Sequence, residues 1–147
     1  MRVLLAVLAL SVLSFADVTR PAYLGLTETR EGRFEVVWRV PRSGDRVLAV
    51  RARLPEGLRE VAAPVVELDA SVQSTSWTVE ANPWELPGSV IVVEGPGRAR
   101  VDVMVRFQFQ DGTVVARVLP PGTTECRFPR RESARSPARE IQAAALD

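Results

Sequence analysis

Hydrophobic and polar residues alternate with a period of two along most of the chain, from Tyr23 to about Leu119. Half-buried strands of an antiparallel sheet have this pattern, because successive side chains point to opposite faces. No stretch in this part of the sequence has the spacing of an amphipathic helix. The clearest run is 99–109, which places Ala99 on an apolar face and Arg98 on a polar one. We therefore predict an all-β fold.

The run 33–40 alternates in the same way and places Trp38 in the predicted core. Charged residues occupy its opposite face. The run 46–54 repeats the pattern, with arginine at 51 and 53 pointing outward. The inward positions predicted for these two runs are Phe34, Val36, Trp38, Val40, Leu48, Val50, Ala52 and Leu54.

Turn residues interrupt the alternation at regular intervals. Asp111-Gly112 is the strongest signal, because both residues tolerate the positive φ of a tight hairpin. Short strands at this spacing predict an antiparallel two-sheet sandwich of the immunoglobulin-like kind, with a closed barrel as the alternative. About eight strands are expected, near 22–28, 33–40, 46–54, 59–68, 71–80, 89–94, 99–109 and 113–119.

The other two tryptophans are also interpreted as structural. Trp77 shares a strand face with Val79, which indicates the core. Trp84 lies in the loop 82–88, and loops carry function more often than strands do. An exposed aromatic side chain there could bind a sugar or a peptide. The favoured interpretation is that Trp84 caps the open end of the sandwich.

The N-terminus has the pattern of a signal peptide. A basic start precedes an apolar run over 3–13, and Ser14-Phe15-Ala16 then places small residues on either side of a larger one. A permanent anchor needs about 20 apolar residues, so this run is short for a membrane span. An uncleaved anchor helix is the alternative.

The sequence thus divides into three parts. Residues 1–16 are the predicted signal peptide, and 17–129 form the predicted β-sandwich domain. Residues 130–147 are polar and charged, as expected for a mobile tail. We expect an exported protein that is soluble in the periplasm or another extracytoplasmic compartment.

Composition argues against several classes of function. The chain has 147 residues, and its net charge of +1 gives no reason to expect nucleic acid as the main partner. Histidine is absent from the sequence, which removes the commonest general base and the commonest metal ligand. All 19 basic residues are arginine. Arginine clusters can bind phosphate, but here arginines alternate with apolar residues, which indicates a solvated sheet face.

The sequence offers no catalytic, cofactor-binding or metal-binding candidates. It has no Gly-x-Ser-x-Gly motif for a nucleophile, and Gly95-Pro96-Gly97 lacks the lysine of a phosphate-binding loop. Cys126 is the single cysteine. It could be reactive or join two chains, but an unpaired thiol after the last strand is the favoured interpretation. Carboxylates without calcium-loop spacing are Glu28, Glu67, Asp69 and Asp102, and Asp45 and Glu56 are interpreted as solvated turn residues.

Several segments together resemble a known family. The chain carries Arg-Pro-Ala-Tyr-Leu-Gly-Leu over 20–26 and a strand ending in Val-Val-Trp-Arg-Val-Pro over 36–41. Over about 17–120 the sequence is similar to the exported N-terminal domain of the HupE/UreJ family of hydrogenase and urease accessory membrane proteins. Further segments that match in the same order are 54–57, 86–92, 102–106 and 111–112.

This resemblance implies an extracytoplasmic β domain associated with a membrane protein. In the family such a domain usually precedes transmembrane helices, whose acidic and histidine motifs are tied to nickel or cobalt handling. This chain ends at Asp147 without those motifs, and Asp17 stands where many relatives have a histidine. The resemblance therefore assigns no transport residue to this chain.

We expect a non-catalytic exported module that serves as an accessory or interaction domain of a HupE/UreJ-like membrane protein. Its expected partner is a membrane or envelope protein, without cofactor, nucleic acid or small-molecule substrate. The alternative is a periplasmic domain that captures or delivers nickel or cobalt for such a transporter. An exported enzyme that uses clustered carboxylates is a third, weaker hypothesis.

The signal-peptide interpretation predicts where the mature chain begins. Cleavage after Ala16 should leave Asp17 as the first residue of the exported protein. Intact-mass measurement of protein recovered from the exported fraction tests this expectation. A mass that includes residues 1–16 would instead support the anchor helix.

Overall fold

The computed structural model describes residues 20–130, so the predicted signal peptide and the tail from 131 onward lie outside the described residues. The described part is all-β, as predicted, and contains two open sheets. The predicted sandwich is therefore confirmed, and the barrel alternative is wrong because neither sheet closes on itself. One 3₁₀ turn, η1 (Arg98–Arg100), precedes the ninth strand.

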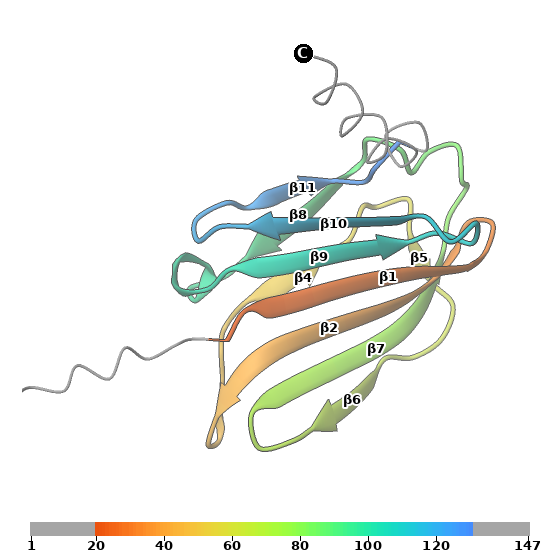
Figure 1. Ribbon diagram of the computed structural model, residues 1–147. Coiled ribbons are helices and arrows are strands. Elements are labelled where there is room, and N and C mark those ends of the chain that lie inside the picture. The colour runs from red at the N-terminus through yellow and green to blue at the C-terminus, as the bar shows by residue number, and fades with distance from the viewer. Residues whose placement is uncertain (1–19, 131–147) are drawn as a thin grey trace, which may run out of the picture.

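The large sheet has eight strands, and the small sheet has three. Figure 1 shows the small sheet lying behind the end of the large sheet formed by β10, β9 and β1, with β7 and β6 at the opposite end. The small sheet has the order β11-β8-β4, with β4 (Arg51–Arg53), β8 (Val90–Glu94) and β11 (Glu125–Arg127). The large sheet contains β1 (Ala22–Arg30), β2 (Arg33–Ser43), β3 (Arg46–Val47), β5 (Arg59–Glu60), β6 (Val65–Leu68), β7 (Val72–Glu80), β9 (Val103–Gln108) and β10 (Val114–Leu119).

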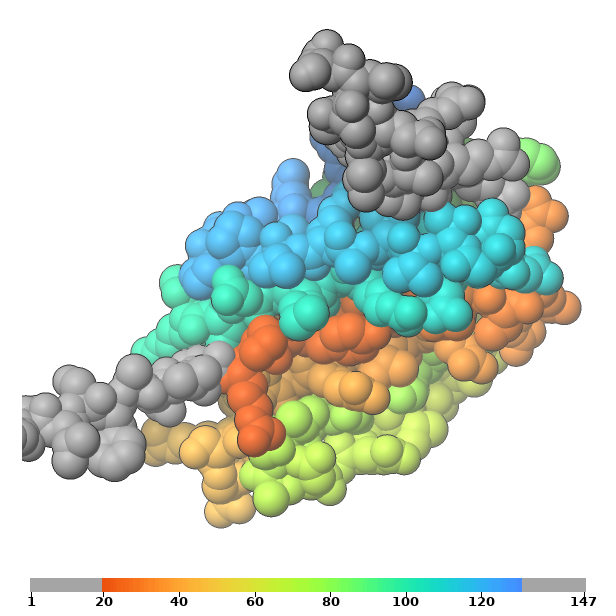
Figure 2. All heavy atoms as spheres, viewed as in Figure 1, coloured from red at the N-terminus to blue at the C-terminus, as the bar shows by residue number. Residues whose placement is uncertain are grey.

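The large sheet has the order β10-β9-β1-β2-β7-β5, with β3 beside β2 and β6 beside β7. All of its strand pairs are antiparallel except one. Strand β1 runs parallel to β9, with Leu24 opposite Val105 and Leu26 opposite Phe107. This pair departs from the predicted all-antiparallel pairing, because β1 begins at the same end of the sandwich as β9. In Figure 2 the outer face continues from β10 through β9, β1 and β2 to β7.

The core lies between the two sheets, and Phe128 is central to it. Its ring meets those of Phe34, Phe107 and Phe109 edge to face, with centroid distances of 5.5, 5.0 and 6.3 Å. The backbone N–H of Phe128 donates to the carbonyl of Ser89 at 2.7 Å, which fixes the residue beside β8. Edge-to-face pairs of this kind stabilise a core beyond the burial of area alone.

The predicted faces of the second strand are confirmed. Phe34, Val36, Trp38 and Val40 are all buried, whereas Glu35 and Arg39 are exposed. Trp77 lies opposite Val36 and is half-buried against the core, on the predicted face. The position of Trp77 near the uncovered end of the large sheet explains why its burial is partial.

Two of the predicted strands are each divided into two. Within 46–54, the chain leaves the large sheet after β3 and enters the small sheet at β4. The alternating pattern continues through both strands, although they belong to different sheets. Within 59–68, β5 and β6 both pair with β7 but are separated by the four residues 61–64. Strand β11 was not predicted, because three residues are too short to show an alternation.

The start of the run 99–109 contradicts its predicted register. Arg98 is buried and Ala99 is exposed, the reverse of the expected arrangement. The cause is the 3₁₀ turn, in which the N–H of Arg98 donates to the carbonyl of Gly95 at 3.0 Å. A turn rotates side chains by about a third of a revolution per residue, so the strand alternation begins only after it.

Arg98 is a structural residue, because its guanidinium donates to four backbone carbonyls. Nε bonds to Thr123 at 2.6 Å and Nη1 to Val101 at 2.6 Å, while Nη2 reaches Leu119 at 3.3 Å and Pro120 at 2.7 Å. Burial lowers the pKa of Arg98, and the charge of Asp102 opposes this effect. The side chain therefore ties η1 to the end of β10 and to the loop that follows it.

The hairpin predicted at Asp111-Gly112 is confirmed, since it joins β9 to β10. Only Gly112 adopts a positive φ, of 87°. The N–H of Gly112 donates to the carbonyl of Phe109 at 2.9 Å, and Asp111 accepts from the N–H of Thr113 through Oδ1 at 2.9 Å. The turn is thus longer than the two-residue form in which both central residues take positive φ.

Trp38→Ala should destabilise the fold by about 3–5 kcal/mol, through lost burial and the cavity left behind. Val37→Ala, on the opposite and less buried face of the same strand, should lower stability by only about 1 kcal/mol. Chemical denaturation of both variants measures the difference. Equal, small losses at the two positions would contradict the assignment of faces.

Arg98→Met keeps much of the side-chain volume but removes every donor to the four carbonyls. An unsatisfied buried carbonyl costs about 1–3 kcal/mol, so we expect a total loss of about 3–5 kcal/mol. Arg100→Met is the matched control two residues away, because Arg100 is exposed and its loss should stay within about 0.5 kcal/mol. Similar urea midpoints for the two variants would show that Arg98 does not anchor this region.

Candidate functional site

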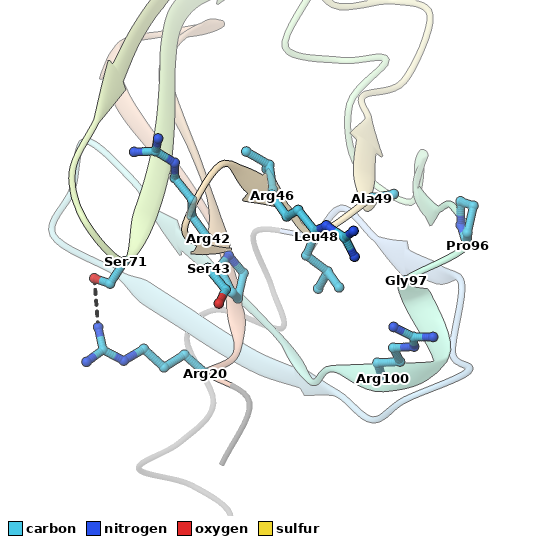
Figure 3. Close-up of a pocket in the computed structure, with 12 residues that line it drawn as sticks. Arg20, Arg42, Ser43, Arg46, Leu48, Ala49, Ser71, Pro96, Gly97 and Arg100 are labelled. Atoms are coloured by element: carbon cyan, nitrogen blue, oxygen red, sulfur yellow. Dashed lines mark hydrogen bonds between the residues drawn. The ribbon is translucent and has the colours of Figure 1, made fainter. Parts of the chain in front are cut away.

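A groove of about 650 Å³ opens at the end of the sandwich where β1 begins. Its walls come from the segment before β1, the β2–β3 hairpin, the turn before β7 and the segment that leads into η1. Four arginines line it, and no aspartate or glutamate is among its described lining residues. Figure 3 shows the side chains of Arg20, Arg42, Arg46 and Arg100 around this groove.

Close backbone packing shapes the apolar floor of the groove. The N–H of Gly97 donates to the carbonyl of Ala49 at 3.0 Å. A Cβ on Gly97 would lie 2.8 Å from Cδ1 of Leu48, so only glycine allows this approach without a shift. The turn at 95–97 thereby packs directly on the segment that crosses between the sheets. Apolar lining residues are Pro41, Val47, Leu48, Ala49 and Pro96.

At one end of the groove, the two arginines already have partners. Nη1 of Arg20 donates to Oγ of Ser71 at 2.9 Å, and Nη1 of Arg42 donates to the carbonyl of Asp69 at 2.8 Å. Hydrogen bonds from the backbone N–H groups of Ser71 and Val72 lower the pKa of the Asp69 carboxyl, and the charge of Arg20 adds to this effect. The positive charge at this end is therefore partly balanced by Asp69.

At the other end, Arg46 and Arg100 are exposed, and neither side chain has a hydrogen-bond or ion-pair partner among residues 20–130. Figure 3 shows both side chains directed toward the space around Leu48. These two guanidinium groups come from β3 and η1, which are far apart in the sequence. They are the two arginines of the groove whose side chains have no partner among residues 20–130.

Several other surface arginines are paired with carboxylates. Glu80 accepts from Arg30 at 2.6 Å and from Arg33 at 3.0 Å, and these contacts lower the pKa of its carboxyl. Arg51 and Arg53 both reach Glu94, at 3.4 and 3.2 Å. These pairs agree with the prediction that arginines lie on a solvated sheet face. Arg46 and Arg100 instead line a groove.

A second candidate surface is the open edge of the large sheet at β6. Val65, Val66 and Leu68 are 58, 55 and 58% exposed. Strand β6 pairs with β7 on one side, and no strand in the described part of the chain pairs with its other side. Such an edge offers free backbone donors and acceptors to another chain.

Two apolar residues of β6 lie on the core face of the large sheet. Val66 is opposite Thr75, which is itself opposite the core residue Trp38. Leu68 lies two residues further along and therefore has the same orientation. Both are more than half exposed, because the small sheet covers the other end of the large sheet.

The opposite edge of the large sheet, β10, also exposes apolar side chains. Val118 pairs with Met104 on the outer face, and these residues are 61 and 44% exposed. Nη1 of Arg117 donates to the carbonyl of Arg127 at 2.7 Å, which links this edge to β11. The β6 edge has no such link within residues 20–130, so it is the more accessible of the two.

Two expectations about single residues are wrong. Trp84 is 80% exposed and does not cap the sandwich; the loop turns outward, with the N–H of Glu85 bonded to the carbonyl of Asn82. Cys126 does not follow the last strand but lies within β11, opposite Ile91, and is buried. Its burial reflects the inward orientation of the middle residue of that strand.

The carboxylates considered in the sequence do not form a metal site. No group of three or more histidine, cysteine, aspartate or glutamate side chains that could hold a metal occurs in the described residues. Glu28 is buried and accepts from the N–H of Gln110 at 3.1 Å, which supports the β9–β10 hairpin. Asp45 and Glu56 are exposed, as expected for turn residues.

Sequence comparison finds no family model and no curated protein that matches this chain. The resemblance to the HupE/UreJ family therefore stays a prediction. Among residues 20–130, no helix has the length and apolar character needed to cross a bilayer.

The sequence did not reveal the groove or the open edge. The four arginines of the groove are spread over 80 positions, from 20 to 100, so only the fold brings them together. The run 65–68 is apolar except for Glu67. A single charge within a short apolar strand is a feature of edge strands. Its exposure depends on how far the small sheet extends.

Proposed function

We propose that this chain is a non-catalytic, exported β-sandwich module that binds a membrane or envelope protein through its β6 edge. The partner we favour is a HupE/UreJ-like membrane protein. The signal-peptide pattern and the resemblance over about 17–120 support this choice. The observation that carries the proposal is the open edge, with three apolar residues more than half exposed on one short strand.

The edge offers two kinds of contact to the same partner. An extended segment can pair with the free backbone groups of β6, in the way that sheets accept an added strand. Apolar side chains of that segment would then cover Val66 and Leu68 on the core face. Binding would complete the layer that the small sheet leaves unfinished at this end.

Edge strands in soluble proteins are usually protected by charge or proline. Here Pro64 precedes β6, and Glu67 is the only charged residue within it. Glu67 pairs with Ser74 on the outer face, so it does not interrupt the apolar positions on the core face. Pro64 and Glu67 thus oppose unselective pairing at this edge, while the apolar core face of β6 stays open to a specific partner.

Site-specific photocross-linking in the native host tests the proposal. A photoreactive residue at Val66 should cross-link to an integral membrane protein that mass spectrometry identifies. The same residue at Glu35, exposed on the outer face of β2, is the control and should cross-link much less. Val66→Lys combined with Leu68→Lys should reduce recovery of the complex about tenfold or more.

Both lysine substitutions replace side chains that are more than half exposed, so stability should change by no more than about 0.5 kcal/mol for each. Thermal unfolding checks this expectation. Equal cross-linking at positions 66 and 35, or no cross-link to a membrane protein, would contradict the proposal.

A further inference from the structure

One end of the groove is lined by two arginines that have no partner among residues 20–130. The β6 edge lies elsewhere and does not account for them. Arg46 and Arg100 lack partners within residues 20–130, whereas the arginines near Glu80 and Glu94 are paired. Two unpaired guanidinium groups directed into one groove attract an anion. Guanidinium groups bind phosphate well, because their fork of N–H donors matches two oxygens at once.

The floor of the groove indicates that the ligand has an apolar part. Leu48 and Pro96 line the space next to the two arginines. The volume of about 650 Å³ lies within the range of about 300–1,000 Å³ that is usual for small-molecule sites. An inorganic ion would leave most of this volume and the apolar floor uncovered.

We propose that the groove binds an organic phosphate, with its phosphate between Arg46 and Arg100 and its apolar part on Leu48 and Pro96. Arg20 and Arg42, at the end that Asp69 balances only in part, contribute longer-range attraction. The ligand can be a soluble phosphate ester or the headgroup of an anionic phospholipid. Both present the same phosphate chemistry, and the experiment separates them.

Calorimetric titration of the purified protein with hexyl phosphate tests the site directly. Hexyl phosphate should bind about tenfold or more tightly than inorganic phosphate, which lacks the apolar part, and than hexanoate, which lacks the phosphate. The double variant Arg46→Gln/Arg100→Gln should weaken hexyl phosphate binding about tenfold or more.

The double variant Arg51→Gln/Arg53→Gln is the matched control. It removes the same charge from exposed positions on β4, outside the groove, and should change the affinity less than about twofold. All variants are checked for unchanged thermal unfolding. Absence of hexyl phosphate binding, equal losses in both double variants, or equally tight hexanoate binding would each overturn the proposal.

Cosedimentation with vesicles identifies the source of the phosphate. Binding to phosphatidylglycerol vesicles but not to phosphatidylcholine vesicles, lost in Arg46→Gln/Arg100→Gln, assigns a lipid headgroup. Binding of hexyl phosphate without vesicle binding assigns a soluble ester. Cross-linking at Val66 tests the β6 edge separately, since β6 contributes no residue to the groove. Failure of either proposal therefore leaves the other standing.

Discussion

The parallel pairing of β1 with β9 is the constraint on which the large sheet depends. On one side, β1 forms a hairpin with β2, which continues to β7 and its two short neighbours. On the other side, β9 forms a hairpin with β10. Without the six residue pairs between Ala22–Thr27 and Val103–Gln108, these two parts would have no hydrogen bonds to each other within the sheet. The register also aligns Leu24 and Leu26 with Val105 and Phe107, so the same contact sets the core.

Arg98 fixes the segment that leads into β9, the strand that pairs with β1. The 3₁₀ turn and the four carbonyl contacts of Arg98 hold the segment between β8 and β9 against the end of β10. The same turn projects Arg100 toward the groove, two residues beyond Arg98. Arg98 therefore stabilises the fold from inside, and Arg100 lines the groove.

Local pattern predicted much of this fold, because most strands are half-buried and long enough to show alternation. The faces of β2 and the β9–β10 hairpin follow directly from it. The burial of Arg98 and the exposure of Ala99 do not follow from the pattern. The sequence Arg-Ala-Arg-Val over 98–101 fits a strand as well as a turn that precedes a strand. The exposure of Trp84 and the burial of Cys126 depend on contacts with distant segments. The open edge depends on where the small sheet ends, and the groove depends on segments that are far apart in the sequence. Short-range sequence patterns encode neither.

The position of Phe128 has a consequence for the order of events during synthesis. Its ring completes the cluster formed with Phe34, Phe107 and Phe109, yet it lies almost at the end of the described chain. A ribosome must therefore translate nearly the whole domain before its interior can close. Until then the aromatic cluster lacks the ring that Phe34, Phe107 and Phe109 all contact.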